Sequence, residues 1–128
     1  MEIYRLGASA AVLGLIVSGG VVAVASAAPP GCSQQTTFTI SSTGVLKNVA
    51  TGSCGGSATR TLVSEIKWDK TASPDPLVAK NSQIKTGTSY SVTVTSCDGG
   101  NTRAYYGRSY FAGYTDYTDS STNTKTSC

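Results

Sequence analysis

The sequence contains few side chains that could carry out catalysis, and it contains no histidine. Without histidine, the usual Ser-His-Asp and Cys-His arrangements cannot form. Asp116 and Asp119 are close enough in sequence to suggest a pair of carboxylates for acid–base chemistry. However, they lie in a loop rich in Ser and Thr, where two solvated aspartates are the simpler interpretation. We therefore expect that the protein is not an enzyme.

Sites for a cofactor or a metal ion are not expected either. The glycine-rich stretch 52–56 lacks the lysine and the helix that follow a phosphate-binding loop, and a tight turn explains it. Zinc sites need closely spaced ligands such as Cys-x-x-Cys, whereas the cysteines of this chain are far apart.

The four cysteines instead favour two disulfides, because an even number in a small exported domain is typical of a crosslinked framework. Four cysteines allow three pairings. We favour Cys32–Cys54 and Cys97–Cys128, because each pair would join neighbouring strands. Each crosslink would stabilise the fold by about 3–4 kcal/mol, by restricting the unfolded chain.

Residues 1–27 have the pattern of a secretory signal peptide. Arg5 precedes an apolar run, which ends in the small-x-small cleavage motif Ala25-Ser26-Ala27. A retained membrane anchor is the alternative, since the run approaches the roughly 20 residues that span a bilayer. Glycines interrupt the run and favour removal. We expect a signal-peptide helix, cleavage after Ala27, and a secreted, extracellular protein with no further contact with the membrane.

The rest of the chain predicts one domain, 36–128, after an extended, proline-containing arm, 28–35. The formal net charge of +3 is a mild excess, and no run of basic residues exists. Nucleic-acid-binding proteins usually carry a dense basic patch. We expect no nucleic-acid partner.

Alternation of apolar and polar residues predicts strands and no helix beyond the signal peptide. The clearest strand is 90–97, which we expect to form a hairpin with a second strand, 102–117, through the turn 98–101. Residues 116–126 are polar and are expected to be flexible. Further strands are expected at 36–40, 45–50, 60–69, 77–80 and around 84.

Ile84, Gly87 and Tyr90 follow one another at intervals of three residues and open the strand Ser-Val-Thr-Val. This pattern, over residues 84–97, resembles the tyrosine corner of immunoglobulin-like and fibronectin type III domains, in which the tyrosine hydroxyl bonds back to the preceding turn. The resemblance implies an all-β fold, a small Greek-key β-sandwich of the immunoglobulin type. It implies no particular function.

Aromatic side chains are concentrated between Ala104 and Tyr117. In one continuous strand, one face would carry a stripe of Tyr106, Arg108, Tyr110 and Tyr114, and the other would carry Tyr105, Ser109, Phe111 and Tyr117. A bend at Gly107 or Gly113 would change this assignment. Tyrosine and arginine are enriched at the energetic centres of protein interfaces, so this stripe predicts binding of another extracellular or cell-surface protein. The alternative is that the rings only cover the sheet, with their hydroxyls in water.

A second candidate site is the loop Ser73, Pro74, Asp75 and Pro76, in which the prolines lower the entropy lost on binding. It suggests a secreted inhibitor of a protease or amylase, although an ordinary connection would have the same composition. The aromatic stripe could also stack on sugar rings, as in a carbohydrate-binding module. The sequence thus predicts a secreted binding module, alone or as a subunit of a secreted complex.

Overall fold

The computed structural model describes residues 28–128, and this part of the chain is built from β-strands. The prediction of an all-β fold is confirmed. The predicted signal peptide, residues 1–27, lies outside the described residues. Within 28–128, no helix is long and apolar enough to cross a bilayer. The strands are β1 (Cys32–Ile40), β2 (Leu46–Trp68), β3 (Leu77–Ser96), β4 (Thr102–Phe111), β5 (Thr118–Asp119) and β6 (Asn123–Thr126).

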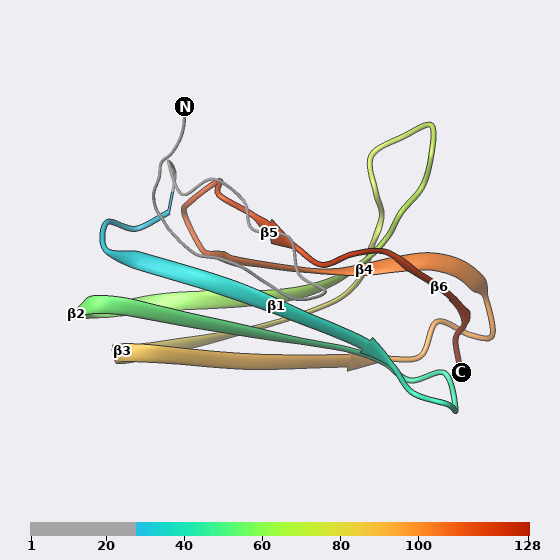
Figure 1. The fold of residues 1–128 in the computed structure, drawn as a ribbon, viewed down its shortest axis with the longest axis horizontal. Coiled ribbons are helices and arrows are strands. Elements are labelled where there is room, and N and C mark those ends of the chain that lie inside the picture. The colour runs from blue at the N-terminus through green and yellow to red at the C-terminus, as the bar shows by residue number, and fades with distance from the viewer. Residues whose placement is uncertain (1–27) are drawn as a thin grey trace.

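One six-stranded sheet curls on itself because the long antiparallel hairpin of β2 and β3 bends in its middle (Figure 1). The register between the two strands shifts between Ser53 and Ala58, where β2 contains Gly55 and Gly56. Residues without a Cβ accommodate such an irregularity well. The first half of β2 pairs with β1 and the second half with β4, so the bend brings β4 over β1.

The hairpin expected between the strands 90–97 and 102–117 does not form. β3 pairs with β2 along its length, and β4 pairs with Leu62–Trp68 on the edge of β2 that β3 leaves open. The connection 97–101 therefore crosses from one half of the curl to the other. Alternation of side chains indicates which face of a strand is buried, but it does not choose the neighbouring strand.

The interior of the curl contains two apolar clusters with a polar layer between them. The first cluster consists of Cys32, Ala50, Cys54, Leu62, Tyr90, Val92 and Phe111. The second consists of Leu46, Ile66, Val94 and Tyr105. Between them, Asn48 Nδ2 donates to Ser64 Oγ at 2.9 Å, and the hydroxyls of Thr36 and Ser109 are hydrogen-bonded. A Cβ on Gly107 would lie 1.9 Å from Asn48 Oδ1, so this layer requires glycine there.

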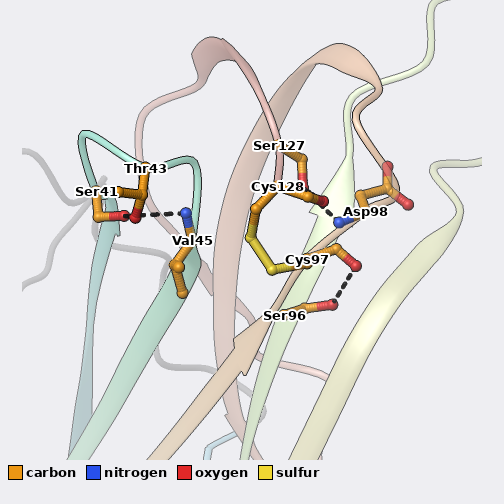
Figure 2. The surroundings of a disulfide bond; sticks show 8 residues. All are labelled: Ser41, Thr43, Val45, Ser96, Cys97, Asp98, Ser127 and Cys128. Atoms are coloured by element: carbon orange, nitrogen blue, oxygen red, sulfur yellow. Dashed lines mark hydrogen bonds between the residues drawn. A yellow bond between two sulfur atoms is a disulfide. The ribbon is translucent and has the colours of Figure 1, made fainter.

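Two disulfides brace the curl, and they join Cys32 to Cys54 and Cys97 to Cys128, the pairs that the sequence favoured. Figure 2 shows the second one, beside the turn that connects β1 to β2. Cys128 N donates to Gly44 O at 2.9 Å, and Asp98 N donates to Ser127 Oγ. The last residues of the sequence are thus fixed to two separate turns.

Two segments differ from their expected description. The strand β1 begins at Cys32, so only 28–31 of the expected arm precedes it, and Pro29 within that piece is fully buried. The segment expected to be flexible, 116–126, is ordered, because β5 and β6 both pair with β4.

Candidate functional site

The outer face of β4 carries much of the predicted aromatic stripe. We call outer the face that points away from the two apolar clusters. Tyr106, Arg108 and Tyr110 alternate along β4 with Tyr105, Ser109 and Phe111, which are buried inside the curl. On the neighbouring strand, the outer residues Lys67, Glu65 and Val63 lie opposite Tyr106, Arg108 and Tyr110.

Tyr114 and Tyr117 exchange the places expected of them. β4 ends at Phe111, and the chain turns through Ala112 and Gly113, where a φ of +88° favours glycine. This turn breaks the alternation on which the expectation relied. Tyr114 packs against the first apolar cluster, whereas the ring of Tyr117 lies edge-on to Tyr110, with 4.9 Å between the ring centroids.

We therefore define the outer-face cluster as Tyr106, Arg108, Tyr110 and Tyr117. The polar groups of Tyr106, Arg108 and Tyr110 are bound to carboxylates of other strands and loops. Arg108 forms a two-bonded ion pair with Asp119 on β5, at 2.7 and 2.9 Å. The hydroxyl of Tyr110 donates to Glu65 Oε2 at 2.7 Å. The guanidinium of Arg108 also lies 4.5 Å from the centre of the Tyr117 ring. The side chains are thus held in fixed positions.

These contacts shift the pKa values of the groups. Burial, together with the hydrogen bonds to carboxylates, raises the pKa of Tyr106 and that of Tyr110 above the usual range. The bond to Asp119 raises the pKa of Arg108. Hydrogen bonds from Tyr106 and from the backbone of Lys70 lower the pKa of Asp75. At neutral pH the tyrosines are therefore neutral donors and Asp75 is a charged acceptor.

The loop between β2 and β3 projects from the rest of the molecule (Figure 1). Hydrogen bonds fix its base. Trp68 N donates to Pro76 O at 3.1 Å, and Lys70 N donates to Asp75 Oδ1 at 3.0 Å. In contrast, the tip, residues 71–74, is exposed. The tip is therefore presented on a rigid support.

Asp75 also brings the two predicted sites together. Its Oδ2 accepts a hydrogen bond of 2.6 Å from the hydroxyl of Tyr106. Of the residues chosen from the sequence, Tyr106 contacts the loop, Arg108 and Tyr110 follow it on the same face of β4, and Tyr114 lies elsewhere. Glu65, Tyr117 and Asp119 belong to the same surface, and sequence reasoning did not select them.

The two aspartates considered for catalysis have different surroundings. Asp119 is paired with Arg108, whereas Asp116 is buried, and burial raises its pKa to about 6. Neither is the solvated loop aspartate that the sequence suggested. Among residues 28–128, no grouping of acids and cysteines could hold a metal ion.

Comparison of the chain with protein-family models, with curated proteins and with solved structures found no match.

Proposed function

We propose that the protein is a non-catalytic module that binds another extracellular protein. The contact surface would consist of the exposed part of the outer-face cluster and the tip of the loop, 71–74, whose base contacts the cluster through Asp75. The observation that carries this proposal is the double role of Asp75, which fixes the loop through Lys70 N and reaches the cluster through Tyr106. A surface that is rigid before binding loses little conformational entropy when it binds.

The chemistry of the cluster supports a protein partner. Tyrosine and arginine are enriched at the energetic centres of interfaces. Tyrosine brings a large contact area with few rotatable bonds. The hydroxyls of Tyr106 and Tyr110 are already bonded to carboxylates. Tyr106 is only 6% exposed, so a partner would meet mainly the half-buried Tyr110 and Arg108 and the ring of Tyr117, rather than free hydroxyls of Tyr106 and Tyr110. Tyr117, which is 39% exposed, is the most accessible ring of the cluster.

Inhibition of a hydrolase is a second candidate, and the fixed base of the loop favours it. An inhibitory loop must be exposed at its tip and rigid at its base, and residues 71–74 and 75–76 have these properties. No observation favours the glycan alternative, because Tyr114 does not join Tyr106 and Tyr110 to make a platform.

We also propose secretion and an immunoglobulin-like sandwich. The two disulfides support an oxidising, extracellular location. The tyrosine-corner resemblance is supported by the hydroxyl of Tyr90, which donates to Gly87 O at 2.7 Å. The same hydroxyl lies 2.7 Å from Ala58 O on β2, so its single proton is shared between the two carbonyls.

The test is affinity capture from culture supernatant with the wild-type protein and with the Tyr117→Ala and Pro74→Ala variants, followed by mass spectrometry. Thr39→Ala, on the exposed side of β1, is the matched control. We expect the two site variants to lose a partner that the control retains, with all thermal midpoints close to wild type. Equal capture by all four proteins would contradict the proposal. Assays against proteases and amylases, with Pro74→Ala as the comparison, test the inhibitory candidate.

A further inference from the structure

One edge of β3 has no neighbouring strand within residues 28–128. β2 has a partner on both sides, whereas β3 pairs only with β2. Residues 80–86 of β3 are exposed on both faces, and Ile84, at 72%, is the most exposed large apolar side chain of the described chain. An edge of this kind is a template for an added strand.

Part of this edge is closed by its own side chains. Asn81 Nδ2 donates to Thr93 O at 2.9 Å, and Asn81 Oδ1 accepts from Ser82 N at 2.9 Å. The hydroxyl of Tyr90 occupies Gly87 O. The segment 83–86 between these points makes no backbone hydrogen bond to any described residue outside β2. This segment, with Ile84 on it, is the open part.

The charge of the edge is of one sign. β3 contains Lys80 and Lys85 and no Asp or Glu. Lys85 lies directly opposite Arg60 on β2, and like charges in opposite positions of a sheet repel. Neither cation is in an ion pair with another residue of 28–128. In addition, the Nε of Arg60 is buried without a hydrogen-bond partner.

We propose that the open edge of β3 binds an extended, acidic segment of another protein by strand addition. Backbone bonds would form along 83–86, with an apolar side chain of the ligand beside Ile84 and a carboxylate beside Lys85 and Arg60. A strand of alternating apolar and acidic residues has this pattern, because its side chains alternate between faces. The carboxylate offsets the repulsion between the two cations.

A second copy of the chain fits this edge less well. Pairing β3 with itself would place the lysines of both copies along one seam that contains no carboxylate. Lysines on exposed edges are a common means of preventing such self-association. The edge lies on the side of β2 opposite β4, so its ligand would contact β3 independently of the surface proposed above.

The test measures amide hydrogen exchange of the whole secreted protein, with disulfides intact, in the presence of a short acetylated peptide of alternating Val and Glu. A Val-Lys peptide of equal length is the matched control. We expect exchange of the outward-pointing amides in 83–86 to slow by about tenfold when the Val-Glu peptide is present at about ten times its Kd. The Val-Lys peptide should cause no slowing. The Lys85→Glu variant should lose the response to Val-Glu peptide.

Three results would overturn the inference. They are no slowing with the Val-Glu peptide, equal slowing with both peptides, and concentration-dependent dimerisation of the protein through this edge. The Tyr117→Ala variant distinguishes the two proposals, because it should retain the response to the peptide even if it loses its protein partner.

Discussion

The hydroxyl of Tyr106 donates a hydrogen bond of 2.6 Å to Asp75 Oδ2, which lies 31 residues earlier in the chain. The bond connects the middle of a strand to a projecting loop, and it joins a neutral donor to a carboxylate of lowered pKa. Hydrogen bonds to charged groups are among the stronger ones in proteins. The position of the loop therefore depends on a side chain that the loop itself does not contain.

Replacing Tyr106 with Phe should loosen the loop without unfolding the sheet. The variant loses one hydrogen bond to a charged group, so we expect a loss of about 1–2 kcal/mol in the free energy of unfolding. Cleavage between Thr71 and Pro74 by a protease should become faster. Urea denaturation and limited proteolysis measure the two effects.

Tyr114→Phe is the control for this change, because no hydrogen bond of the Tyr114 hydroxyl is seen among the described residues. It should leave both measurements near wild type. Asp75→Asn combined with Tyr106→Phe should cost less than the sum of the single changes, since both remove the same bond. Additive effects would contradict the assignment of this bond.

The Asp116→Asn variant should be more stable than the wild type at neutral pH. Burial raises the pKa of Asp116 to about 6, so between about pH 4 and pH 6 the folded protein holds a proton that the unfolded chain has released. Stability from this group therefore falls as the pH rises through that window. We expect a gain of about 1–3 kcal/mol at pH 7 and little difference at pH 4. Urea denaturation across this range measures it, and a constant difference at all pH values would contradict the cause.

The Tyr110→Phe variant should be destabilised, because its hydroxyl is bonded to a carboxylate that is only 8% exposed, Glu65. Removing one partner leaves a buried charged group with one bond fewer, which costs about 1–3 kcal/mol. Adding Glu65→Gln should recover part of the loss, since the neutral amide is less costly to bury. A double-mutant cycle by thermal unfolding measures the recovery, and no recovery would show that ring packing alone is responsible.

The Lys85→Glu variant should be more stable than the wild type, although it should no longer bind an acidic strand. It replaces a repulsive pair opposite Arg60 with an attractive one, a change of about 0.2–1 kcal/mol. The exposed Lys80→Glu, which has Glu65 opposite, is the matched control and should lower stability instead. Equal shifts in the two melting temperatures would indicate that the change in net charge, rather than the residue opposite each lysine, determines the change in stability.

Removing either disulfide should destabilise the protein by a similar amount. The crosslinked cysteines are 22 and 31 residues apart, and chain entropy depends only weakly on loop length, so each Cys pair replaced by Ser should cost about 3–4 kcal/mol. Urea denaturation of the two variants measures this cost. A much larger loss of unfolding free energy on replacing Cys97 and Cys128 would show that the turns bonded to the end of the chain depend on this disulfide.

The sequence predicted what depends on local alternation. The two faces of β4 follow from period two as far as Phe111, and the disulfide pairs follow from the positions of the cysteines. The predicted strand pairing was wrong, because pairing joins segments that are far apart in the sequence. Nothing local indicates that β4 pairs with Leu62–Trp68 rather than with β3.

The same distinction explains the candidate site. Glu65 and Asp119 bind their partners because β2 and β5 flank β4, and this arrangement was not visible in the pattern of any single strand. Tyr117 was assigned to the wrong face because a turn at Gly113 changes the direction of the chain.

β2 is 23 residues long and takes part in both halves of the curl. Neither half is therefore a foldon of its own. Because β2 pairs with β1 in one half and with β4 in the other, it cannot detach from one half without breaking hydrogen bonds in the other. Partial opening should be confined to the projecting loop, and the slowest-exchanging amides on both sides of the bend should report one common free energy of global, cooperative unfolding.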